Sequence, residues 1–111
     1  MSSSSVASPK PRAAKRIFRD ILAELRAISF HEAMALQRDA ITLRREMKLL
    51  YSDRIFRTPL LLRAIQVLES YCDALEEEQQ EMNLDEMGAV DAEIDRINHL
   101  IMDAEELVEK N

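Results

Sequence analysis

The side chains that could bind a metal ion are a histidine and two carboxylates near the end of the chain. Asp95, His99 and Asp103 recur every four residues, so they would share one face of a helix. Metal sites in helical bundles usually combine carboxylates with a Glu-x-x-His motif from several facing helices, and the sequence contains no Glu-x-x-His. We interpret this row as a solvated helix face and expect no metal ligand.

The motifs of other catalytic or cofactor-binding sites are missing from the sequence. A single glycine excludes glycine-rich phosphate-binding loops. A single cysteine, Cys72, excludes a disulfide or a cysteine zinc site within the chain. The acidic run at residues 76–78 lacks the loop and the central glycine of a calcium site. We therefore predict a non-enzymatic protein with no catalytic residue, no metal and no cofactor.

The composition indicates an all-α fold. Leu, Met, Ala, Glu and Arg dominate the 111 residues, and there are only one Gly and three Pro. The dominant residues lose least on entering a helix, whereas a sheet protein would need more β-branched and turn residues. Apolar residues recur with gaps of three and four, the period of helices that pack side by side at about 20°. We expect a small antiparallel helical bundle or coiled coil of three to four helices.

Composition divides the chain into a tail and a helical domain. Residues 1–13 are rich in Ser and Pro, contain no acidic residue and are expected to be disordered. Residues 14–111 form the predicted helical domain. We place its helices at about residues 14–28, 30–55, 59–82 and 89–109.

Capping signals mark the expected helix starts. Ser29 opens an S-x-x-E capping box that should start the second helix. Thr58 suits the N-cap of the third helix and Pro59 its first position, where no amide hydrogen is needed. Gly88 weakens the helical pattern before the fourth helix, although Asn83 offers an earlier start.

The last predicted helix carries a long, regular apolar stripe, and we predict that this stripe contacts a partner. Its gaps of four and three residues are typical of coiled-coil packing. Replacing Ile97 or Ile101 with Asp should then abolish association. The period does not decide whether the partner helix belongs to this chain or to another. The predicted partner-binding residues are Val90, Ile94, Ile97, Ile101, Ala104, Val108, Leu68 and Leu75.

Charge is divided unevenly along the chain. Residues 1–63 contain 13 Lys/Arg and 6 Asp/Glu, a net charge of +7, whereas residues 64–111 contain 2 and 15, a net charge of −13. The halves attract each other if the chain folds back, or either half recruits an oppositely charged partner. The basic half makes nucleic-acid binding an alternative. The acidic half and the lack of interleaved aromatic residues disfavour it.

The first residues bear on localisation and on membrane contact. A basic, Ser-rich start without acidic residues resembles a mitochondrial transit peptide as well as a solvated tail. No run approaches the roughly 20 apolar residues that span a membrane. Phe18 and Leu22 could bring the first helix to a membrane surface, but a core-facing stripe explains the same residues. We expect an intracellular protein that is mitochondrial, cytoplasmic or nuclear.

One segment resembles a known family. Residues 15–29, K-R-I-F-R-D-I-L-A-E-L-R-A-I-S, resemble the start of the LYR-motif proteins of mitochondria, with Ile17, Phe18 and Arg19 in place of the Leu-Tyr-Arg triplet. The family's basic run ending in Phe corresponds to L-R-R-E-M at residues 43–47. The resemblance covers residues 15–80 and implies an assembly factor that docks an acylated acyl carrier protein. The implied contacts with this acidic partner are Arg19, Arg44, Arg45 and Lys48.

The sequence as a whole favours a subunit that binds other proteins through its apolar seams. Such a subunit would act as a scaffold, adaptor or assembly factor of a multiprotein complex, or as a homo-oligomer. Two alternatives stay open: an LYR-like mitochondrial assembly factor that docks acyl carrier protein, and an accessory protein that binds nucleic acid through the basic N-terminal half.

Overall fold

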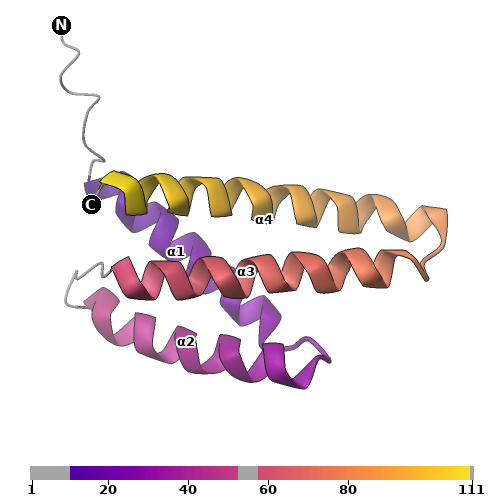
Figure 1. Ribbon diagram of the computed structural model, residues 1–111, viewed down its shortest axis with the longest axis horizontal. Coiled ribbons are helices and arrows are strands. Elements are labelled where there is room, and N and C mark those ends of the chain that lie inside the picture. Colours follow the sequence, from indigo (N-terminus) through magenta and orange to yellow (C-terminus); the bar gives the residue numbers. More distant parts are fainter. Residues whose placement is uncertain (1–10, 53–57, 111) are drawn as a thin grey trace, which may run out of the picture.

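The computed structural model describes residues 11–52 and 58–110, which form four α-helices and no strand. In Figure 1, α3 and α4 run antiparallel along most of their length, α1 crosses them at an angle, and α2 lies on the far side of α3 from α4. This arrangement confirms the predicted all-α bundle. The helices are α1 (Pro11–Ile28), α2 (Met34–Ser52), α3 (Thr58–Gln79) and α4 (Leu84–Lys110).

The core is built from the apolar stripes of all four helices. Phe18 of α1, Leu43 of α2, Leu68 of α3 and Ile97 of α4 are all fully or almost fully buried. A buried Leu, Ile or Phe side chain contributes roughly 1.5–3 kcal/mol to stability. The stripes therefore hold the helices of one chain together, and the apolar side of α1 faces this core instead of a membrane surface.

The turn between α1 and α2 differs from the prediction, because α2 begins at Met34 and not at residue 30. The amide and the hydroxyl of Ser29 both donate to the carbonyl oxygen of Arg26, at 3.1 and 2.5 Å. Ser29 thus completes the last turn of α1, where carbonyl groups lack helical partners, and does not cap α2. His31 shapes the turn instead, since its Nδ1 accepts a hydrogen bond from the Ala33 amide at 3.1 Å.

The fourth helix begins earlier than predicted, at Leu84 and not at residue 89. The carbonyl oxygen of Asn83 accepts hydrogen bonds from the amides of Glu86 and Met87, at 3.0 and 3.2 Å. These bonds start the helix at the earlier of the two positions that the sequence offered. Gly88 therefore lies inside α4, where it weakens the helix without ending it.

The third helix begins at Thr58, with Pro59 in its first turn, and ends at Gln79, before the predicted residue 82. Residues 1–10 of the predicted tail and residues 53–55 of the predicted second helix lie outside the described residues. The last three residues of that tail, 11–13, are helical. Across residues 11–52 and 58–110, no helix combines the length and apolar character that crossing a membrane requires.

Candidate functional site

The predicted partner-binding seam lies inside the bundle. Five of its residues are buried, namely Leu68, Leu75, Ile97, Ile101 and Ala104. The other three are partly buried against the same core, namely Val90, Ile94 and Val108. Because α4 packs on α3 and α1 of its own chain, the stripe is not presented to another protein in this arrangement. This corrects the expected effect of Ile97→Asp, which would place a charge in the core and unfold the bundle.

The four basic residues predicted to contact an acidic partner lie on two helices. Arg19 is exposed on α1, whereas Arg44, Arg45 and Lys48 belong to α2. Arg45 and Lys48 are exposed, but Arg44 is half-buried. The Nε atom of Arg44 is buried without a hydrogen-bond partner among the described residues. The structure therefore brings Arg45 and Lys48 together on the surface of α2 and leaves Arg19 on another helix.

A row of exposed apolar side chains runs along α2. Leu43 and Met47 mark the side of this helix that faces the core. At 3.6 residues per turn, Met34, Ile41 and Leu49 lie on the opposite side, and they are 69%, 41% and 70% exposed. Single exposed apolar residues are ordinary on a protein surface, but several on one helix face are typical of an interaction site.

Basic residues fill the gaps in this apolar row. Arg38, Arg45 and Lys48 share the side of α2 that points away from the core. Both acidic residues of α2, Asp39 and Glu46, lie to one side of that row, and Glu46 accepts a hydrogen bond from Arg63 of α3 at 2.6 Å. The surface is thus apolar and basic with no carboxylate on it. We call it the outward face of α2; its residues are Met34, Arg38, Ile41, Arg45, Lys48 and Leu49.

Known proteins offer no guide to this surface. No protein-family model, curated protein or solved structure matches the chain. The resemblance of residues 15–80 to the LYR-motif family is therefore neither supported nor refuted by these comparisons, and the interpretation of the surface rests on its own geometry.

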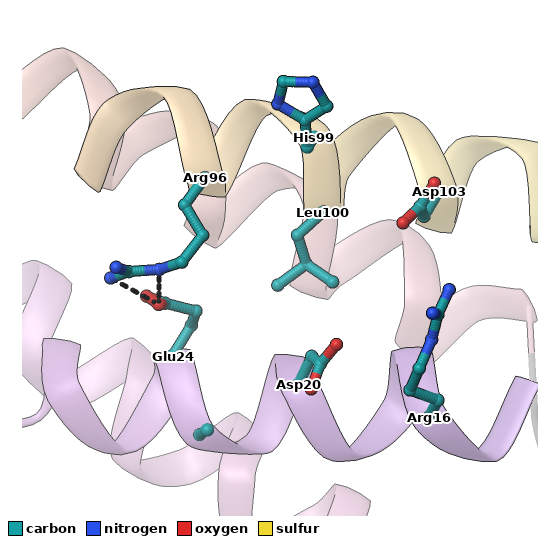
Figure 2. Close-up of a pocket in the computed structure, with 8 residues that line it drawn as sticks. Arg16, Asp20, Glu24, Arg96, His99, Leu100 and Asp103 are labelled. Atoms are coloured by element: carbon teal, nitrogen blue, oxygen red, sulfur yellow. Dashed lines mark hydrogen bonds and ion pairs between the residues drawn. The ribbon is translucent and has the colours of Figure 1, made fainter. Parts of the chain in front are cut away.

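A groove between α1 and α4 gathers other charged side chains (Figure 2). Glu24 is only 9% exposed, and one of its carboxylate oxygens accepts hydrogen bonds from Nε and Nη2 of Arg96, at 3.2 and 3.1 Å. Leu100 points from α4 into the groove between this pair and Asp103 (Figure 2). The pair ties α1 to α4. The groove is lined by Arg16, Asp20, Ala23, Glu24, Arg96, His99, Leu100 and Asp103.

Two residues of the Asp-His-Asp row, His99 and Asp103, line the edge of this groove on α4. His99 points away from α1 in Figure 2, and its Nδ1 donates a hydrogen bond to the carbonyl oxygen of Asp95 at 2.8 Å. This hydrogen bond and the negative charge of Asp95 raise the pKa of His99 above its ordinary value of 6.5. Among the described residues, no three His, Cys, Asp or Glu side chains come together in a way that could hold a metal ion.

A polar cluster holds the start of α2 against α3. Tyr71 donates a hydrogen bond to Glu93 of α4 at 3.2 Å, and burial together with Glu93 raises the pKa of Tyr71, so the phenol stays neutral. The His31 ring packs edge-on to Tyr71 with 5.4 Å between ring centroids. Because Nδ1 of His31 accepts from the Ala33 amide, Nε2 carries the proton and donates to Glu78 at 2.5 Å. These contacts fix the turn from which the outward face extends.

Sequence reasoning missed the apolar residues of this face, although the sequence contains a signal for them. Met34 and Ile41 are seven residues apart, and both fall outside the stripe of the predicted second helix that includes Leu36, Leu43 and Leu50. Apolar residues left over from a core stripe, at helical spacing, predict a second apolar face on the same helix.

Proposed function

We propose that the chain is a non-catalytic interaction subunit that binds another protein through the outward face of α2. The observation that carries the proposal is the position of Met34, Ile41 and Leu49, which are exposed on the side of α2 opposite the core. These side chains leave apolar surface in contact with water instead of burying it in the core. Covering them with a partner would remove that surface from water, which is favourable.

The charges of this face indicate the chemistry of the partner. Arg38, Arg45 and Lys48 alternate with the apolar residues along about 22 Å of helix, from Met34 to Leu49. An amphipathic helix that alternates carboxylates with apolar residues would match both features at once. Helices that bind membrane surfaces usually separate a wide apolar face from a basic one, so the interleaved arrangement favours a protein partner.

The contact should be reversible. One helix face offers less area than the roughly 1,200–2,000 Å² that stable protein interfaces bury. The exposed Arg and Lys side chains would add modest pairwise energies that salt weakens. Their main effect would be to select an acidic partner and to speed its encounter with α2.

Charge reversal on the outward face tests the proposal. The variant R38E/R45E replaces two cations of this face, and K15E/R26E makes the same charge change at exposed positions of α1. We expect wild type and K15E/R26E to co-purify the same partner from native extract, and R38E/R45E to lose it. Equal recovery by all three proteins, as judged by quantitative mass spectrometry, would contradict the proposal. Circular dichroism should show the same helix content in each.

An acyl carrier protein is a specific second candidate for the partner. The LYR-family resemblance implies this partner, and two of the implied contacts, Arg45 and Lys48, lie on the outward face of α2. Recovery of acyl carrier protein with the wild-type chain, and its loss with R38E/R45E, would support this assignment. Recovery of a different protein with the same dependence would leave the interaction role in place and remove the family assignment.

Nucleic acid fits the outward face less well than protein does. Phosphate binding needs the cations, but it leaves Met34, Ile41 and Leu49 exposed to water. A gel shift that fades steeply with salt and is lost in R38E/R45E would nevertheless favour this alternative.

A further inference from the structure

The helix on the opposite side of the bundle has an outward face of the opposite sign. On α4, the row opposite the buried residues Ile97 and Ala104 consists of exposed carboxylates, the exposed His99 and two exposed apolar side chains, Leu84 and Met102. Leu84, at the start of the helix, is 86% exposed, and Met102, among the carboxylates, is 63% exposed. We call the part of this row from residue 95 onward the outward face of α4; its residues are Asp95, His99, Met102, Glu106 and Glu109.

The two outward faces have matching spacing. On α2, Ile41 is followed by cations four and seven residues later, and a third cation, Arg38, precedes it by three. On α4, Met102 is followed by carboxylates four and seven residues later, and a third, Asp95, precedes it by seven. With Ile41 packed on Met102, a parallel approach brings Arg45 and Lys48 to the level of Glu106 and Glu109, and Arg38 to that of His99. An antiparallel approach brings Lys48 to the level of Asp95 and Arg38 to within one residue of Glu106.

Within one chain these faces cannot meet. Among the described residues α2 makes no contact with α4, and the two helices lie on opposite sides of the molecule in Figure 1. We propose that the outward face of α4 docks on the outward face of α2 of a second copy of this chain. This inference rests on the proposed interaction role of α2 and names the partner as the chain itself.

The geometry determines the kind of assembly that results. The contact joins two different faces, so a pair of docked copies still has an unused α2 face at one end and an unused α4 face at the other. Such head-to-tail contacts form open chains, or rings where the rotation closes. Since a single helix-on-helix contact is smaller than a stable dimer interface, association should depend on protein concentration and weaken as salt screens the charges.

Sedimentation equilibrium of the purified chain, up to about 1 mM, where weak pairs are populated, tests this inference. We expect the mean mass of wild type and of the control K15E/R26E to rise with concentration at low salt. The variants R38E/R45E, on α2, and D95K/E106K, on α4, should each associate at least about tenfold more weakly. An equimolar mixture of these two variants should associate again, because one retains an intact α4 face and the other an intact α2 face.

Several results would overturn the inference. They are a monomeric wild type at every concentration, association that either variant leaves unchanged, and a mixture that stays monomeric. If wild type is monomeric but recovers a partner from native extract, and R38E/R45E loses that partner, then a different protein occupies α2 and the proposed function survives. If wild type is monomeric and floats with phosphatidylserine vesicles, and R38E/R45E does not float, then the outward face of α2 binds a membrane surface. Circular dichroism of each variant checks that the helices are intact.

Discussion

The ion pair between Glu24 and Arg96 should respond asymmetrically to removal of its two partners. Glu24 is 9% exposed and its second carboxylate oxygen has no hydrogen-bond partner among the described residues, whereas the Arg96 side chain is 64% exposed. Arg96→Ala leaves a buried carboxylate without its cation, a change that costs about 3–5 kcal/mol for a fully buried pair. Solvent reaches the arginine side, so we expect a loss of about 1–2 kcal/mol.

Glu24→Leu should be far milder, because it removes the buried charge and adds apolar contacts with the core. Such replacements are often neutral or stabilising, and we expect a change within about 1 kcal/mol of zero. The assay is urea unfolding followed by circular dichroism at neutral pH, with unchanged m-values as the check on two-state behaviour. The exposed Arg63–Glu46 pair is the control, and Arg63→Ala should cost less than about 1 kcal/mol. A Glu24→Leu protein less stable than Arg96→Ala would refute the reasoning.

Three further predictions follow from local features. Gly88 lies inside α4 with open space where a side chain would extend, so Gly88→Ala should stabilise the protein by about 0.5–1 kcal/mol in the same unfolding assay. The pKa of His99, followed by NMR, should lie above the ordinary value of 6.5. Asp95→Asn should lower this pKa, because it removes the coulombic attraction of the carboxylate and leaves the backbone hydrogen bond in place. An unchanged pKa in Asp95→Asn would contradict this. Burial raises the pKa of the Cys72 thiol from 9.0 to about 11, so iodoacetamide at pH 8 should react at least about 100-fold more slowly than with the unfolded chain.

The sequence predicts the fold well because the core depends on a simple repeat. Phe18, Leu43, Leu68 and Ile97 lie in apolar stripes at helical spacing, and all four are buried in the bundle. Any compact packing of such helices buries these stripes, whatever the turns between them. The all-α class follows without knowledge of the tertiary contacts.

The helix boundaries are less predictable, because they depend on contacts distant in sequence. Ser29 satisfies the pattern of a capping box, yet its hydroxyl bonds back to Arg26. His31, which shapes the turn instead, is held by Tyr71 and Glu78 of α3. Those residues lie at least 40 positions further along the chain, so local capping rules cannot foresee their effect.

The burial of the predicted partner-binding stripe could not be foreseen from the sequence for a related reason. A 3.5-residue period shows that a helix packs on other helices, but Ile97 and Ile101 carry the same pattern whether the neighbour belongs to the same chain or to another. Burial in this structure assigns them to the core. The residues available to a partner are then those that the core stripe leaves over, such as Ile41 and Leu49.

Photo-crosslinking from position 41 tests most directly whether the outward face of α2 is a docking surface. A photoreactive amino acid replaces Ile41 in one protein and Gln66, an exposed residue of α3, in a control protein. Both are irradiated in native extract. We predict a crosslinked protein at position 41 that is absent at position 66, and a product of two copies of this chain if α4 is the occupant. No product at position 41, or the same products at both positions, would contradict the proposed role of α2.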